Sequence, residues 1–202
     1  MGVLRLSSNI IGSEIILRPY QFCNLTEVVI RSTDTEQDLE RKIAIATILG
    51  TLQATYTKFP YLRQIWQDNT NEERLLGVSL TGIMDNPLTT TANPDLQGLL
   101  ERLREVSVMV NKEWAGKLGI KQSTAITAVK PSGTVSQLVN SASGIHARHS
   151  EYYIRTVRGA FNDPLTQFMK DQGIPWEPCA HQPDTTVVFS FPQKSPKQAV
   201  LT

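Results

Sequence analysis

Short apolar runs alternate along this chain with longer segments in which apolar residues recur every three or four positions. The short runs are rich in β-branched residues, as strands are. They occupy residues 14–18, 25–31, 75–82, 124–129, 152–159 and 185–191. Strands that alternate with helices are typical of α/β folds, so the pattern predicts parallel strands with helices outside them, in a sheet or a barrel.

The first predicted helix lies within residues 32–57. Thr33 and Glu36 are three residues apart, which is the spacing of a capping box. The apolar residues that follow recur at helical spacing and make a wide face: Leu39, Ile43, Ile45, Ala46, Ile48, Leu49, Leu52 and Tyr56. We expect this helix to pack against the sheet.

The second predicted helix has signals at both ends. Asn93 is the predicted N-cap, Pro94 occupies the first helical position, and Gly119 ends the helix. One face is predicted to be apolar and buried, and it consists of Leu96, Leu99, Leu100, Leu103, Val106, Val110 and Trp114.

Shorter segments complete the predicted order of elements. Residues 162–173 read as a third helix, which Gly173 and Pro175 end. Residues 71–74 end a further helix just before an apolar run, and residues 191–198 read as a loop.

Composition narrows the kinds of protein that this chain can be. With 202 residues and 40% hydrophobic content, it can bury a core of ordinary size. Lys and Arg number 20 against 19 Asp and Glu, so no overall basic field favours DNA or an anionic membrane, and any anion site must be local. No apolar run reaches the roughly 20 residues of a membrane span. The two cysteines are too few for a disulfide scaffold, and we expect reduced thiols in the cytoplasm.

The most informative stretch follows the fourth apolar run and reads KPSGTVSQL. Pro131 ends strand pairing and Gly133 allows a tight turn. Ser132, Thr134 and Ser136 add hydroxyl groups near peptide N–H groups, and such an arrangement at the start of a helix can bind phosphate. The same residue types also make ordinary turns, and the Lys-Ser/Thr pair of a Walker loop is missing, so an ordinary turn stays an alternative.

Three stretches resemble the catalytic subunit of ribonucleotide reductases and occur in the same order as in that family. They read EIILRPYQFCNLTEV, NEERLLGVSLTGIMD and KPSGTVSQLVNSASGIHARHSEYYIRTVRG. They are most similar to the adenosylcobalamin-dependent class II enzymes. The resemblance implies that residues 1–202 are a single fragment of the later part of the catalytic domain. Its fold would be a partial α/β barrel of the reductase type, a half-barrel of parallel strands with helices outside.

The resemblance also implies a chemistry. In that family a cysteine in an Asn-Pro-Cys-x-Glu motif forms a transient thiyl radical, which removes the 3′ hydrogen of the ribose. The glutamate takes the proton of the 3′-hydroxyl group. The 2′-hydroxyl group leaves as water, and two cysteine thiols supply two electrons as they become a disulfide. The resemblance places Cys23 on one cysteine of this redox pair and Glu14 on the glutamate, with the other redox cysteine outside this chain.

The chain departs from the family at the radical cysteine. The aligned position is Gly12 or, with one residue inserted, Ile11, and neither carries a thiol. We therefore expect that this polypeptide alone does not reduce nucleotides. We interpret residues 1–12 as a non-native or replaced leader.

Each candidate residue also has a plainer explanation. Cys23 can be a small buried apolar residue, as most cysteines outside disulfides are. Glu14 can pair with Arg18 on an exposed strand, which stabilises little. Cys179 and His181 are close in sequence, but two ligands make a poor zinc site, so no metal is predicted.

The sequence therefore predicts a fragment of a ribonucleoside di- or triphosphate reductase that binds substrate phosphates at Ser132, Gly133, Thr134 and Ser136. Adenosylcobalamin is the cofactor of the parent family, and its site is not expected to be complete in this chain. The expected partners are a thioredoxin-like reductant and either a second copy or a chain that carries the N-terminal half. Two alternatives stay open: a nucleotide- or phosphate-binding half-barrel without chemistry of its own, and a fragment of a class I large subunit.

Overall fold

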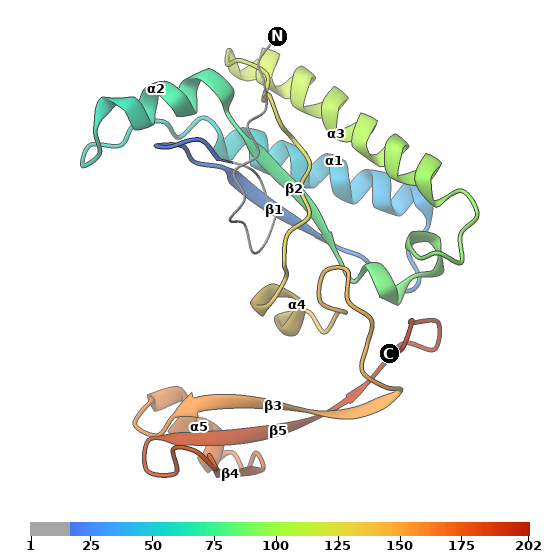
Figure 1. Cartoon of the computed structure of the whole chain (residues 1–202), viewed down its shortest axis with the longest axis vertical. Helices are drawn as coiled ribbons and strands as arrows, with labels where there is room; N and C mark the ends of the chain where they lie inside the picture. The colour runs from blue at the N-terminus through green and yellow to red at the C-terminus, as the bar shows by residue number, and fades with distance from the viewer. Residues whose placement is uncertain (1–16) are drawn as a thin grey trace. The chain divides into compact units, whose positions relative to one another are not determined.

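A computed structural model describes residues 17–202, which divide into two compact units (Figure 1). Of these residues, 17–147 and 198–200 belong to the first unit, and 148–197 and 201–202 to the second. The predicted leader and most of the apolar run at 14–18 lie outside the described residues.

Parallel strands form the sheet of the first unit. Strands β1 (Asn24–Val29) and β2 (Leu76–Thr81) pair along their whole length. The segment 125–128 continues the sheet on the other side of β2, where Val78 and Thr127 form a parallel bridge. The carboxyl ends of all three segments therefore lie at one edge of the sheet.

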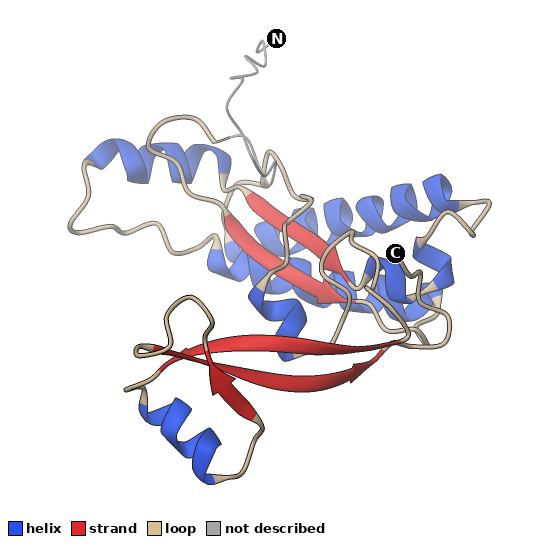
Figure 2. Ribbon diagram, turned by 60° about the horizontal axis from the view of Figure 1, so that its bottom comes forward, coloured by secondary structure: helices blue, strands red, loops and turns tan. Residues whose placement is uncertain are grey.

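Two helices, α1 (Glu36–Gln53) and α3 (Leu96–Leu118), cover one face of this sheet in both ribbon views (Figure 1, Figure 2). The core lies between these helices and the sheet. It consists of buried apolar side chains, among them Val28, Ile30, Leu39, Ile43, Ala46, Leu76, Val78, Leu99 and Leu103. Because successive residues of a strand point to opposite faces, Val28 faces these helices and Glu27 faces away from them.

Helix α1 begins later than the sequence predicted. Thr35 is its N-cap and accepts a hydrogen bond from the backbone N–H of Asp38 at 3.2 Å, while the Asp38 carboxylate accepts from the backbone N–H of Thr35 at 3.1 Å. The capping box thus exists, but the predicted pair of Thr33 and Glu36 was wrong. Residues 31–34 form a turn instead, which delays the helix.

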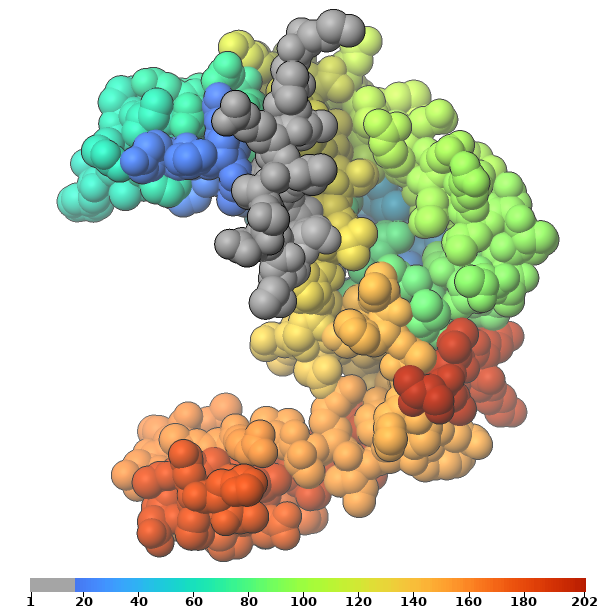
Figure 3. Space-filling model, viewed as in Figure 1, coloured from blue at the N-terminus to red at the C-terminus, as the bar shows by residue number. Residues whose placement is uncertain are grey.

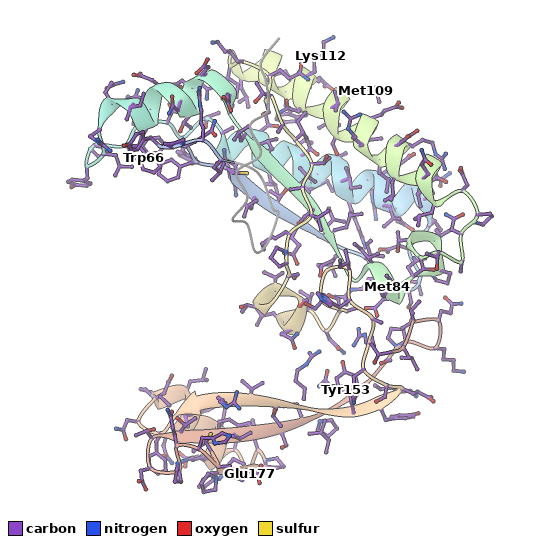
Figure 4. All side chains as sticks on the ribbon, viewed as in Figure 1. Trp66, Met84, Met109, Lys112, Tyr153 and Glu177 are labelled. Carbon is purple, nitrogen blue, oxygen red and sulfur yellow. The ribbon has the colours of Figure 1, made fainter. Side chains whose placement is uncertain are left out.

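Helix α3 ends at Gly119 as predicted, with φ +65. Its N-cap is Asp95, because the Asn93 side chain accepts a hydrogen bond from the Asp95 backbone N–H at 3.0 Å before the helix begins. The predicted apolar face was partly wrong. The residues that α3 buries are Leu99, Leu103, Ser107, Asn111 and Ala115. The buried stripe thus becomes polar and small towards the end of the helix, while Met109 and Lys112 lie on exposed positions (Figure 4).

Shorter elements connect the strands and helices of the first unit. Helix α2 (Gln64–Glu73) ends at Arg74, in the left-handed region with φ +45, which confirms the helix end predicted there. The others are η1 (Ile83–Asp85), η2 (Pro87–Thr89) and α4 (Thr134–Leu138). Gly82, between β2 and η1, has φ +75, and a Cβ atom there would lie 2.6 Å from the Ile30 carbonyl oxygen, so only glycine fits.

The second unit is an antiparallel sheet with one helix. Its strands are β3 (Tyr152–Ala160), β4 (Trp176–Pro178) and β5 (Thr186–Lys194), in the order β3-β5-β4. Helix α5 (Pro164–Asp171) confirms the third predicted helix. The prediction of parallel strands was wrong here, because β3 is exposed along most of its length and parallel sheets are buried on both faces. The predicted loop at 191–198 begins only after Lys194, where β5 ends.

The fold confirms the α/β class and the helices outside the parallel strands. Residues 17–202 form small parallel and antiparallel sheets, and no barrel is seen among them. In this part of the chain no helix combines the length and the apolar character needed to cross a bilayer.

Candidate functional site

Glu27 lies within β1, and its side chain is only 6% exposed. The ammonium group of Lys130 lies 2.7 Å from one oxygen of the Glu27 carboxylate, and the Ser132 hydroxyl donates a hydrogen bond to the other oxygen. A buried carboxylate is costly without such partners. This cluster therefore fixes the segment around Pro131 onto β1.

The turn before α4 is closed by its own serines. Ser132 Oγ accepts a hydrogen bond from the Ser136 backbone N–H at 3.2 Å, and Ser136 Oγ donates to the Ser132 carbonyl oxygen at 3.0 Å. The hydroxyl of Ser143 donates to the same carbonyl. Both Ser132 and Ser136 are buried, whereas Gly133 and Thr134 are exposed. Of the four predicted phosphate ligands, two thus hold the turn together and two are open to solvent.

The loop after α4 returns to the carboxyl end of β2. The Thr81 hydroxyl donates to the Ala142 carbonyl at 3.1 Å and accepts from the Gly144 backbone N–H at 2.9 Å. The Asp85 carboxylate accepts from the Ala142 backbone N–H at 2.8 Å. Thr81 and Asp85 are both buried, so the turn and its loop are anchored at the carboxyl edge of the parallel sheet.

Cys23 is partly buried and precedes the first residue of β1. Its neighbour Phe22 packs against Phe59 and against Trp66 of α2, which Figure 4 labels. The Phe22 ring centroid lies 4.6 Å from that of Trp66 and 4.9 Å from that of Phe59. Four positions separate Cys23 from Glu27, which corresponds to about 13 Å of extended backbone. Strand β1 thus connects the predicted redox cysteine to the residue that holds the predicted phosphate turn.

Glu14 lies outside the described residues, as do Gly12 and Ile11, the positions aligned with the radical cysteine. The catalytic roles predicted for Glu14 and Cys23, and the phosphate role of the turn, stay predictions.

Cys179 is buried in the second unit. Hydrogen bonds from the backbone N–H groups of His181 and then Gln182 lower the pKa of the Cys179 thiol, and the Arg158 guanidinium adds to this effect, while burial opposes it. No cluster of three or more metal-ligating side chains occurs within residues 17–202.

A cavity of about 650 Å³ lies in the first unit, on the side of the sheet that the helices cover. Figure 3 shows the molecule hollowed between α3 and the segment that follows it. The lining is mostly apolar, and among the described residues it includes neither Cys23 nor the residues of the predicted phosphate turn. It is formed by Ile43, Val78, Leu80, Ile83, Met84, Thr89, Thr90, Thr91, Leu96, Leu100, Leu103, Arg104, Ser107, Thr127, Ala128, Val129 and Ile145.

Sequence reasoning missed Glu27 and Lys130 as members of this site. A signal was present, because Glu27 interrupts an apolar strand and a charge in such a strand is either exposed or paired. Lys130 directly precedes the Pro-Ser-Gly turn. Thr81 and Asp85 gave no comparable signal, since the loop residues that they bind are far away in the sequence.

Comparisons with known proteins extend these observations. No protein-family model matches the chain. It is similar to the adenosylcobalamin-dependent ribonucleoside-triphosphate reductase of Euglena gracilis, with 29% identity over 180 residues that cover 87% of this chain and 24% of the relative. The enzyme of the same description from Lactobacillus gasseri is 30% identical over 172 residues, covering 71% of this chain and 23% of the relative. The chain thus spans about a quarter of the length of these relatives.

A solved structure gives the same picture. The crystal structure of a B12-dependent class II ribonucleotide reductase matches with a TM-score of 0.73 and 25% sequence identity. The match covers 93% of this chain and 30% of that chain.

Proposed function

We propose that this chain, which is homologous to part of the adenosylcobalamin-dependent class II ribonucleotide reductases, forms one wall of a ribonucleotide site. In this proposal Ser132, Gly133, Thr134 and Ser136 form the turn that receives the phosphates of a ribonucleoside di- or triphosphate. Cys23 is one thiol of the pair that supplies electrons.

The observation that carries the proposal is the double link from Glu27 to Lys130 and Ser132. It ties the turn to the strand that begins directly after Cys23, so the two motifs belong to one structural unit. The turn also follows a strand segment at the carboxyl edge of the parallel sheet, and ligands of open α/β sheets bind outside the carboxyl ends of the strands.

The proposed chemistry of Cys23 needs a second thiol. Loss of the 2′-hydroxyl group as water consumes two electrons, and two thiols provide them as their sulfur atoms join in a disulfide. We propose that the second thiol, the radical cysteine and a thioredoxin-like reductant come from other polypeptides or from sequence beyond these 202 residues. This activity belongs in the cytoplasm, where thiols stay reduced.

Adenosylcobalamin supplies the initiating radical when it is bound to the relatives that depend on it. The cavity of about 650 Å³ has the size of sites for drug-sized ligands, and a cobalamin with its adenosyl group and nucleotide tail is larger than such ligands. The cavity therefore does not fit this cofactor, and the roles proposed for this chain are phosphate binding and thiol chemistry.

A block at Gly133 tests the phosphate site. A Cβ atom at Gly133 would meet no atom within 4 Å, so a side chain there begins in open space, and Gly133→Val covers the backbone that a phosphate must approach. Gly116 in α3 is a matched control, because a Cβ atom there also meets nothing within 4 Å. We expect calorimetry to show that the chain binds a ribonucleoside triphosphate, that Gly133→Val weakens binding about tenfold or more, and that Gly116→Val does not.

Two results would contradict the proposed phosphate site. One is a wild-type chain that binds no ribonucleotide, and the other is a Gly133→Val chain that binds as tightly as the wild type.

The missing thiol at Gly12 and Ile11 favours a second candidate function, a nucleotide-binding module without chemistry of its own that assembles with another chain. Such a module would bind nucleotide at the same turn. It differs from the enzyme fragment in one respect, because replacing Cys23 would leave ribonucleotide reduction by the assembly unchanged. A fragment of a class I large subunit would differ from both candidates, because ribonucleotide reduction by its assembly would not depend on adenosylcobalamin.

A further inference from the structure

We propose that Glu27 is the positioning residue of the phosphate turn. Its carboxylate holds the Ser132 hydroxyl in place. Its negative charge also offsets the positive charge of Lys130, so Glu27 determines the net charge beside a bound phosphate. This inference rests on the proposed function, since it takes the turn to be the phosphate site.

The geometry of the cluster is the first argument. Each oxygen of the Glu27 carboxylate has one partner, and the two partners lie on either side of Pro131. The proline ring fixes φ at its own residue. Holding both neighbours of a rigid residue leaves the turn little freedom to move away from β1.

Burial is the second argument. The side chains of Glu27 and Lys130 are 6% and 23% exposed, whereas those of the ion pair between Glu113 and Lys117 on α3 are 59% and 56% exposed. Exposed pairs contribute little to stability, but breaking a buried pair leaves an uncompensated charge and is strongly unfavourable. The charge balance at the turn therefore depends on both members of the buried pair.

The cluster also decides which groups of the turn are left for a ligand. The Ser132 hydroxyl proton is donated to Glu27, and the Ser136 hydroxyl lies 3.0 Å from each of the carbonyl oxygens of Ser132 and Gly133. These hydroxyl groups hold the turn in shape. The exposed Gly133 and Thr134 are then the residues that contact phosphate, through backbone N–H groups and the Thr134 hydroxyl.

Charge makes the inference testable. Glu27→Gln keeps the length of the side chain and an oxygen that can accept from Ser132, but it leaves the Lys130 ammonium uncompensated beside the phosphates. Lys130→Gln leaves the Glu27 carboxylate uncompensated in the same place. The two substitutions should therefore change the affinity for phosphate in opposite directions.

The experiment measures binding of inorganic tripolyphosphate, a phosphate chain without base or ribose, to the 202-residue chain by calorimetry at several salt concentrations. We expect Glu27→Gln to tighten binding about threefold or more, with a steeper salt dependence, and Lys130→Gln to weaken it about threefold or more. The double variant should return close to wild type. Glu113→Gln removes the same charge far along α3 and should change nothing.

A further variant leaves Glu27 in place, so that the inference does not depend on the folding of the Glu27→Gln chain. Ser132→Ala removes one of the two links while both charges remain. We expect weaker tripolyphosphate binding with an unchanged salt dependence.

The possible results separate this inference from the proposed function. If the wild type binds tripolyphosphate and the Glu27, Lys130 and Ser132 variants bind equally well, Glu27 is not a positioning residue, although the phosphate site stands. If Glu27→Gln and Lys130→Gln both weaken binding in parallel with thermal stability, Glu27 has only a structural role. If the wild type binds neither tripolyphosphate nor nucleotide, the proposed function fails and this inference with it.

Discussion

Cys179 shows at the scale of one residue how backbone N–H groups change the chemistry of a side chain. Hydrogen bonds from the backbone N–H groups of His181 and then Gln182 favour its thiolate form, and the Arg158 guanidinium adds a positive charge. The pKa of Cys179 is therefore lowered, and at neutral pH a larger fraction of this thiol is ionised than of an ordinary cysteine.

Removing the charge of Arg158 should raise the pKa of Cys179 towards its usual value. In a Cys23→Ser background, where Cys179 is the remaining thiol, we expect Arg158→Gln to shift the pH titration of the Cys179 Cβ signal in carbon NMR to higher pH. The matched control is Arg155→Gln on the same strand, because the Arg155 guanidinium lies over the Tyr153 ring, 5.7 Å from its centroid. Superimposed titration curves with and without Arg158→Gln would show that Arg158 does not act on this thiol.

The lowered pKa of Cys179 also makes the stability of the fold depend on pH. Because the pKa of Cys179 is lower in the folded chain than in the unfolded one, ionisation of this thiol favours the folded state above the unfolded pKa. This contribution is lost as the pH falls through the folded pKa.

At the scale of elements, the contact between α1 and α3 depends on a buried amide. The Asn111 side chain is fully buried, and its Nδ2 atom donates to the hydroxyl oxygens of Thr51 and Ser123 at 3.0 and 3.1 Å. Its Oδ1 atom accepts from the Ser123 backbone N–H at 3.0 Å. One side chain thus connects both helices to the segment that leads into the sheet.

Replacing this amide should be costly, because the buried Ser123 N–H loses its acceptor. We expect Asn111→Ala to lower the free energy of unfolding by about 2–3 kcal/mol in urea denaturation. Lys112→Ala changes the next, exposed residue of α3 and should stay within about 0.5 kcal/mol of wild type. An Asn111→Ala chain as stable as the Lys112→Ala chain would mean that this hydrogen-bond network contributes nothing.

Local patterns were enough to predict most of the elements, but not their exact faces and ends. The strand β1, the stop of α3 at Gly119 and the helix α5 follow from nearby residues alone. The apolar pattern predicted that Val110 and Trp114 are buried, but α3 buries Ser107 and Asn111 instead. These polar residues are buried because the facing helix α1 presents small polar residues at this contact. A periodicity in one segment carries no information about the residues of another.

The candidate site also has one part that could be predicted from nearby residues and one part that could not. The Pro-Ser-Gly-Thr turn could be predicted because its residues are adjacent in sequence. The link from Ser132 to Glu27 joins residues 105 positions apart, and it depends on how three strand segments pair. Only the folded chain brings such residues together.

At the scale of the whole molecule, the chain matches only part of each reductase to which it is similar. It corresponds to about a quarter of the length of its relatives, and it has no thiol at the position aligned with the radical cysteine. In the proposed function the chain contributes a substrate wall and one redox thiol, so we expect it to bind a nucleotide but not to remove the 3′ hydrogen or complete a disulfide by itself. We therefore expect turnover to need an Asn-Pro-Cys motif and a second redox thiol, either from another polypeptide or from sequence beyond these 202 residues.

An assay of deoxyribonucleotide formation tests this division of roles. With adenosylcobalamin, a ribonucleoside triphosphate and a dithiol reductant, we expect no product from the chain alone and product when a polypeptide with the N-terminal half of a class II reductase is added. Cys23→Ser should abolish multiple turnover in that mixture, because one of the two sulfur atoms of the disulfide is gone. Cys179→Ser is the matched control and should leave turnover unchanged. Product from the chain alone would show that its radical chemistry does not need the missing cysteine, and undiminished turnover with Cys23→Ser would favour the module without chemistry of its own.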